Sequence, residues 1–211
     1  MAAWKWESKD PLRLIAYLAL AAIASTLKVR LPRITGTISV NFVLLLVALA
    51  ELSFSETVLM SAIAGAVQVV WKPKHRPALV QVLFSSSCLA LSAGLAWIVG
   101  KWAVQASGID IGMMGLLALS TTILYFSNTL MVSAVLSLAQ TGTTSGVWKN
   151  CCFWSFPYYL AGAAAGLMVM TARTAGWQSS LLVFPLMGLL FVSYRIHVTQ
   201  AGVRQADPSA A

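Results

Sequence analysis

Long apolar segments separated by charged residues form the dominant pattern of the chain. Seven stretches without charge follow one another, at 14–27, 34–50, 57–71, 77–100, 111–148, 150–172 and 174–194. They are apolar on all sides, whereas the strands of a membrane barrel alternate apolar and polar residues. Because a membrane-crossing helix needs roughly 20 apolar residues, the pattern predicts an all-α, polytopic transmembrane bundle of six or seven spans over 11–197. Polar segments at 1–10 and 198–211 flank this domain.

Two segments differ from the others in length. The stretches 34–50 and 57–71 are short, and Glu51, Ser53, Ser55 and Glu56 separate them. The region 38–71 is interpreted either as two short full spans or as a re-entrant hairpin shielded by its neighbours. By contrast, 111–139 predicts one long, tilted helix.

Composition supports a membrane location. The chain has 211 residues, of which 59% are hydrophobic and 9% charged, against about 25% charged in a soluble domain. Its mean hydropathy is +0.81 and its pI about 9.8. These values exclude an ordinary soluble enzyme, and the basic balance is explained by membrane topology without nucleic acid.

Lysine and arginine predict the orientation. Alternate connections between the segments lie on the same side of the membrane. Nine of the lysine and arginine residues lie on one side, at 28–33, at 72–76, before 150 and after 194, and five lie on the other side. Because cytoplasmic loops are the basic ones, we expect a multi-pass protein of a bacterial inner membrane with a cytoplasmic C-terminus and an outer N-terminus. Two alternatives concern the first segment: it lies along the inner surface, with the N-terminus inside, or it is a signal peptide.

Familiar catalytic and metal-binding patterns are absent. The chain has no H-E-x-x-H, G-x-S-x-G, P-loop or G-x-G-x-x-G motif. The spacing of His75 and His197, and of Cys88, Cys151 and Cys152, gives no metal-ligand set. No apolar segment carries an acidic residue at its centre, where a proton relay is expected. The sequence therefore predicts neither an enzyme nor a proton pump, with no metal and no cofactor.

Four amides inside apolar segments are the main candidates for a ligand site: Asn41, Gln68, Gln81 and Asn128. An amide in hydrocarbon needs a partner, so each is expected to point inward. One interpretation is that each hydrogen-bonds a neighbouring helix and fixes packing. The other is that some converge on a pocket, since amides supply both donors and acceptors.

An aromatic stretch is the second candidate. Six of the twelve residues in WKNCCFWSFPYY, at 148–159, are aromatic. Within it, Trp154 and Tyr158 are the candidate ligand contacts. The alternative is an aromatic belt at the inner interface of the membrane. Gly162 and Gly166 follow with the small-xxx-small spacing of closely packed membrane helices.

A basic loop is the third candidate. Lys72, Lys74, His75 and Arg76 lie between two apolar segments. They are interpreted either as a topology anchor or as a contact for anionic lipid or a phosphorylated partner on the cytoplasmic face.

Several short runs resemble a known kind of region. They are KVRLP at 28–32, GTISVNF at 36–42, QVLF at 81–84, SNTL at 127–130 and FWSFPYYL at 153–160. Together they are similar to the integral-membrane sensory region that precedes GGDEF or HD output domains in bacterial signalling proteins. The resemblance implies several helices, a cytoplasmic C-terminus and a sensory role. No output domain follows residue 195 in this sequence.

A second resemblance concerns the segment 36–66. It is similar to the start of the substrate-binding components of energy-coupling-factor transporters, which implies a partner ATPase. Ala21 and Ser25 have the spacing for such docking. The sequence thus predicts a non-catalytic sensor or ligand-binding membrane protein. The alternatives are a small-molecule uptake subunit and an accessory subunit of a membrane complex.

We expect the loop at 72–76 and the C-terminus to face the cytoplasm together, because of the lysine and arginine bias. A reporter that is active only in the cytoplasm, fused at each position in turn, should be active at both. Activity of a periplasm-specific reporter at the C-terminus would contradict this orientation.

Overall fold

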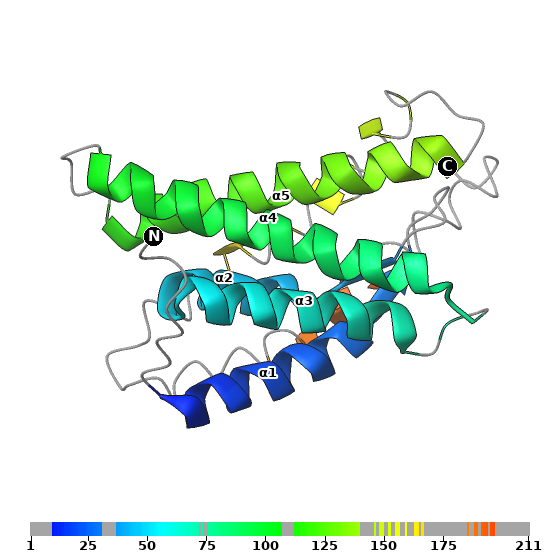
Figure 1. Cartoon of the computed structure of the whole chain (residues 1–211), viewed down its shortest axis with the longest axis horizontal. Helices are drawn as coiled ribbons and strands as arrows, with labels where there is room; N and C mark the ends of the chain where they lie inside the picture. The colour runs from blue at the N-terminus through cyan, green and yellow to red at the C-terminus, as the bar shows by residue number, and fades with distance from the viewer. Residues whose placement is uncertain are drawn as a thin grey trace.

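The chain forms a bundle of helices in a computed structural model. The structure describes residues 10–30, 37–71, 73, 76–106 and 112–139, and separate residues between 146 and 196. Its elements are α1 (Pro11–Thr26), β1 (Lys28–Arg30), β2 (Thr37–Ser39), α2 (Phe42–Glu51), α3 (Phe54–Val70), α4 (Leu79–Ala106) and α5 (Gly112–Ala139). Figure 1 shows α4 and α5 along one side, α2 and α3 in the middle and α1 on the opposite side.

Local capping signals define where two helices begin. The carboxylate of Asp10 accepts a hydrogen bond from the Arg13 amide at 3.2 Å, and Pro11 occupies the first turn of α1. Ser53 and Glu56 form a capping box at the start of α3. The tight turn between α2 and α3 is therefore specified by the polar residues that separate the two apolar segments.

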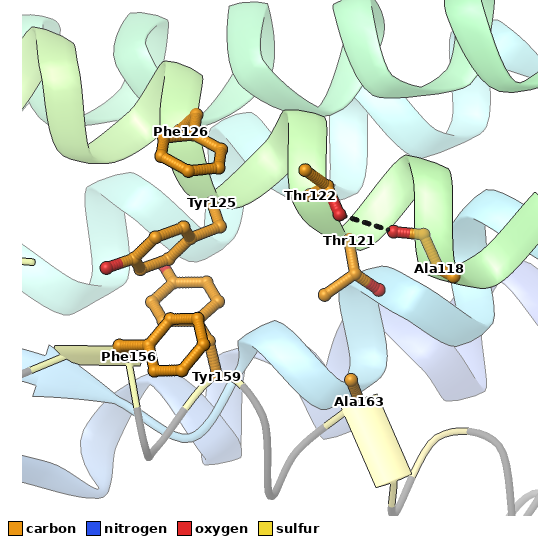
Figure 2. Close-up of a pocket in the computed structure, with 8 residues that line it drawn as sticks. All are labelled: Ala118, Thr121, Thr122, Tyr125, Phe126, Phe156, Tyr159 and Ala163. Atoms are coloured by element: carbon orange, nitrogen blue, oxygen red, sulfur yellow. Dashed lines mark hydrogen bonds between the residues drawn. The ribbon is translucent and has the colours of Figure 1, made fainter.

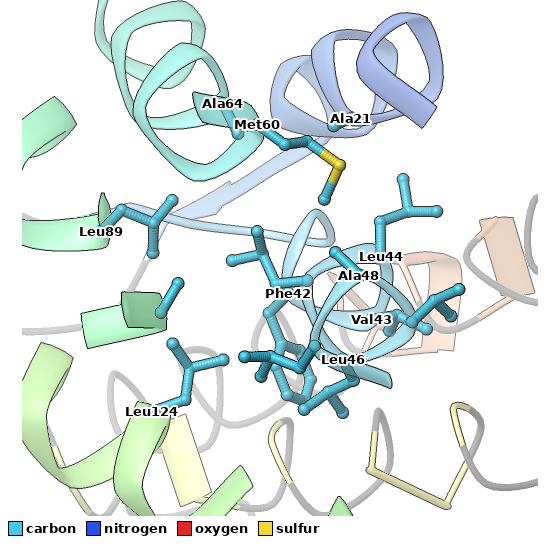
Figure 3. Close-up of a cluster of buried hydrophobic side chains, with 14 of the residues drawn as sticks. Ala21, Phe42, Val43, Leu44, Leu46, Ala48, Met60, Ala64, Leu89 and Leu124 are labelled. Carbon is cyan, nitrogen blue, oxygen red and sulfur yellow. The ribbon is translucent and has the colours of Figure 1, made fainter. Parts of the chain in front are cut away.

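Helix α2 lies at the centre of the bundle. Its residues from Phe42 to Leu49 are all buried, with Val43, Leu45 and Ala48 fully so. Figure 3 shows their side chains radiating toward Met60, Leu89 and Leu124 on the surrounding helices. A helix that is apolar on every side is stable only when it is surrounded. At 1.5 Å per residue, α2 is about 15 Å long, half of the roughly 30 Å hydrocarbon core.

The start of α2 differs from the sequence prediction. The apolar segment 34–50 is not one helix, because Thr37–Ser39 form a strand that pairs antiparallel with Lys28–Arg30. The β-branched residues Thr37, Ile38 and Val40 favour extended backbone before the leucine-rich run begins. The all-α prediction is confirmed in outline for the described residues, to which this ribbon is a small β addition.

Helices α4 and α5 match the predicted helices at 77–100 and 111–139. Each contains a stretch long and apolar enough to cross a membrane, Leu79–Ala103 and Gly115–Leu138. They are the two helices of that kind in the part of the chain that is described. The predicted helices at 150–172 and 174–194 are described only at single residues, and 1–9 and 197–211 lie outside the described residues.

Glycine allows α3 and α4 to approach closely. A Cβ placed on Gly65 would lie 2.6 Å from the backbone oxygen of Ser85, a contact that real Cβ atoms do not make. On α4, a Cβ on Gly94 would lie 3.4 Å from Val58, an ordinary van der Waals contact. The two positions therefore make a matched pair on the same helix interface.

We expect Gly65→Ala to destabilise the protein by about 1–3 kcal/mol, because the two helix backbones must separate. Gly94→Ala should be neutral or slightly stabilising, since alanine favours helix over glycine. Unfolding midpoints of both purified variants in the same detergent measure the difference. Equal midpoints would contradict the close contact.

Candidate functional site

A cavity lies between α5 and residues that follow it in the chain. Its volume is about 230 Å³. Its lining residues are Ala118, Thr121, Thr122, Tyr125, Phe126, Phe156, Tyr159 and Ala163. Figure 2 shows the aromatic rings on one side and the threonines with Ala118 and Ala163 on the other. The cavity is thus mostly apolar, with a few hydroxyl groups, as small-molecule sites usually are.

Four aromatic rings form one wall of this cavity. The ring of Tyr125 packs against Tyr159, Phe126 and Phe156 with centroid distances of 4.7, 5.2 and 6.0 Å. The interplanar angles are 64–69°, the edge-to-face arrangement that aromatic quadrupoles prefer. The ring of Tyr159 also packs on Phe42 of α2, with centroids 4.3 Å apart and an interplanar angle of 47°. The wall is therefore braced against the central helix.

Polar contacts tie the same wall to α4 and α5. The side-chain amide of Asn128 donates to the hydroxyl of Tyr159 at 3.3 Å. Its oxygen accepts from the thiol of Cys88 at 3.5 Å. Of the predicted candidates, the amide at 128 and the aromatic stretch at 148–159 are thus brought together, with Tyr159 as their link.

Asn41 and Gln68 lie elsewhere, around the β ribbon. Asn41 is buried, and its amide donates to the Ser25 hydroxyl at 3.2 Å, which in turn donates to the Ala21 carbonyl at 2.7 Å. The oxygen of Gln68 accepts from Ser39 at 3.0 Å. These bonds join α1, α2 and α3, which is the packing role that the sequence offered as one interpretation.

The remaining candidates occupy other positions. Gln81 is exposed, and its side-chain oxygen accepts from the Ala78 amide at the start of α4. Arg76 is exposed in the preceding loop. The other predicted contacts, Lys72, Lys74, His75, Trp154 and Tyr158, lie outside the described residues.

Lys28, which the sequence placed in a basic loop, belongs to the ribbon instead. Its ammonium group donates to the Trp71 carbonyl at the end of α3. Partial burial lowers the pKa of this lysine below its ordinary value. The contact fastens β1 to the end of α3, so Lys28 has a structural role at this position.

The turn between α2 and α3 holds acidic groups whose burial the sequence did not indicate. Glu56 is 2% exposed, and its Oε2 accepts from the Ser53 amide at 3.0 Å and hydroxyl at 2.9 Å. Its Oε1 is buried without a hydrogen-bond partner. Glu51 accepts from the Tyr17 hydroxyl at 2.7 Å. From sequence, these residues were expected only to separate the two short apolar segments, either as two spans or as a re-entrant hairpin.

No group of three or more His, Cys, Asp and Glu residues with metal-binding geometry occurs among the described residues. Cys88 and Cys152 are free thiols. No protein-family model, curated protein or solved structure matches the chain. The cavity geometry is consequently the main basis for a functional proposal.

We expect Asn41→Ala to destabilise the protein by about 1–3 kcal/mol, because a buried hydroxyl and the start of α2 lose their partner. Asn128→Ala, beside the cavity, should alter ligand affinity as well. Thermal unfolding and ligand titration of both variants separate the two roles. A change in ligand affinity for Asn41→Ala without lost stability would assign Asn41 to a site instead.

Proposed function

We propose that the chain is a multi-pass integral protein of a bacterial inner membrane, of sensor or ligand-binding type. In this proposal a small, mostly apolar molecule binds in the cavity beside Tyr125 and Tyr159. The single observation that carries it is an aromatic-walled cavity of about 230 Å³ on a helix long and apolar enough to cross a membrane.

The outward faces of α4 and α5 support the membrane location. Only 33% of each apolar stretch is buried inside the structure, whereas a core helix of a soluble protein is mostly buried. The large apolar side chains that remain exposed on them include Leu79, Val80, Leu83, Leu91, Ile98, Trp102, Phe126, Leu130 and Leu138. So many exposed apolar side chains on two long helices favour contact with lipid.

The surroundings of Tyr159 support a sensory role. Its ring contacts Phe42 of α2 and Tyr125 of α5, and its hydroxyl accepts from Asn128. Asn128 in turn contacts Cys88 of α4. A ligand that repositions this ring changes its contacts to α2 and α5 directly, and reaches α4 through Asn128. A ligand shifts a conformational equilibrium only through such differential contacts.

An uptake subunit is the second candidate function, and helix α2 favours it. A half-length, buried helix preceded by extended backbone is common at the substrate sites of transporters. Uptake of radiolabelled probe into proteoliposomes that contain the purified chain and an ATPase partner tests this alternative. Binding without uptake, together with a response of a fused output domain, supports the sensor.

We expect Ala163→Phe to weaken binding of indole, used as a two-ring probe, at least about ten-fold, or about 1.4 kcal/mol, because the added ring fills the cavity. Ala164→Phe is the matched control, since Ala164 is exposed and does not line the cavity. Titration calorimetry in detergent measures affinity, and unfolding midpoints confirm folding. Equal affinities for both folded variants would remove the cavity as the site.

A further inference from the structure

Three of the hydroxyl protons at the cavity wall, those of Thr121, Thr122 and Tyr125, are already used within the protein. Thr121 donates to the Leu117 carbonyl at 2.6 Å, and Thr122 donates to the Ala118 carbonyl at 2.8 Å. Figure 2 marks the second of these bonds. Tyr125 donates to the Cys152 carbonyl at 3.0 Å. Because a hydroxyl has one proton and two lone pairs, these three groups present only acceptor sites to the cavity.

The hydroxyl oxygens of the two tyrosines also accept hydrogen bonds from the protein. The oxygen of Tyr125 also accepts from the Ser155 hydroxyl at 3.5 Å, and the oxygen of Tyr159 accepts from Asn128. The threonine hydroxyls have no second contact of this kind among the described residues. Thr121 and Thr122 are therefore the groups best placed to accept a hydrogen bond from a bound molecule.

The described lining of the cavity is also uncharged. The wall at residues 118–126 belongs to the membrane-length stretch Gly115–Leu138, where a charged ligand is costly to bring. Among the described lining residues an anion would find no cationic group, and the hydroxyl protons of Thr121, Thr122 and Tyr125 are donated elsewhere. A carbonyl-bearing ligand would likewise find no donor on these hydroxyls.

Size and ring geometry narrow the ligand further. A dry apolar cavity of about 150 Å³ holds benzene, and this cavity is larger, at about 230 Å³. The edge-to-face rings of Tyr125 and Tyr159 offer a flat molecule further contacts of the same kind. The volume thus fits one or two fused rings.

We propose that the cavity selects neutral, planar molecules of one or two rings that carry an N–H or O–H donor, which Thr121 or Thr122 accepts. This inference rests on the proposed function, because it specifies the ligand class of the same site. It concerns the direction of the hydrogen bond, which the proposed binding role alone does not fix.

Indole and N-methylindole test the inference, because a methyl group replaces the N–H donor of indole in the second molecule. Titration calorimetry of the full chain in detergent should give tighter binding of indole by about five-fold, equivalent to one neutral hydrogen bond. Indole-2-carboxylate, an anion, should not bind. N-methylindole partitions more strongly into apolar surroundings, so a preference for indole cannot arise from partitioning.

A double variant, Thr121→Val with Thr122→Val, should bring the two affinities to the same value, since valine keeps the shape and removes the acceptor. Ser127→Ala is the matched control: Ser127 also donates to a carbonyl of its own helix, at 2.6 Å, but does not line the cavity. It should retain the preference.

The outcomes separate the two proposals. Equal binding of indole and N-methylindole to the unmodified chain, or tight binding of the anion, would overturn the donor inference and leave ligand binding intact. A preference for indole that survives in the folded double variant would also overturn it. Failure of every probe to bind would reject the proposed function itself.

Discussion

The burial of a helix without a polar face is the constraint on which the rest of the bundle depends. Helix α2 ends inside the protein, so the backbone groups that its last turn leaves open need partners there. The Ala48 carbonyl accepts from the Leu52 amide at 2.8 Å and also from the Thr57 hydroxyl at 3.2 Å. The carbonyl of Leu52, which follows α2, accepts from the Trp97 indole at 3.2 Å. These bonds fix α3 and α4 relative to α2. At the other end, Asn41 joins α2 to α1 through Ser25.

Residues of the candidate site are positioned by packing against this central helix. Phe42, the first residue of α2, is 3% exposed and packs on Tyr159. Gly166 lies against Leu46 one turn further along α2, where its absent side chain leaves 3.4 Å between a Cβ position and the leucine. Tyr159 and Gly166 thus both lie against α2. The cavity lies between α5 and the residues Phe156, Tyr159 and Ala163.

Uninterrupted apolar length made α4, α5 and the central segment predictable, whereas position within the bundle did not follow from sequence. Thr37 and Ile38 together are apolar enough to continue the apolar segment, so the start of α2 at Phe42 was not predicted. The burial of Glu56 was not predicted, because the sequence does not show that the turn between α2 and α3 is covered. Asn128 and the aromatic stretch were identified by residue type. Most of the cavity wall was missed, although residues 118, 121, 122, 125 and 126 follow the i, i+3, i+4, i+7, i+8 spacing of one helix face.

The hydroxyls of α5 that bond within their own helix have a mechanical consequence. These hydroxyls, on Thr121, Thr122 and Ser127, donate to carbonyls of α5 itself. They therefore neither connect α5 to another element nor oppose its rotation about its axis. Ser120, Tyr125 and Asn128, by contrast, form hydrogen bonds that reach from α5 to other parts of the bundle. A molecule seated against Tyr125 therefore acts on one of the side chains that connect α5 to the rest of the bundle.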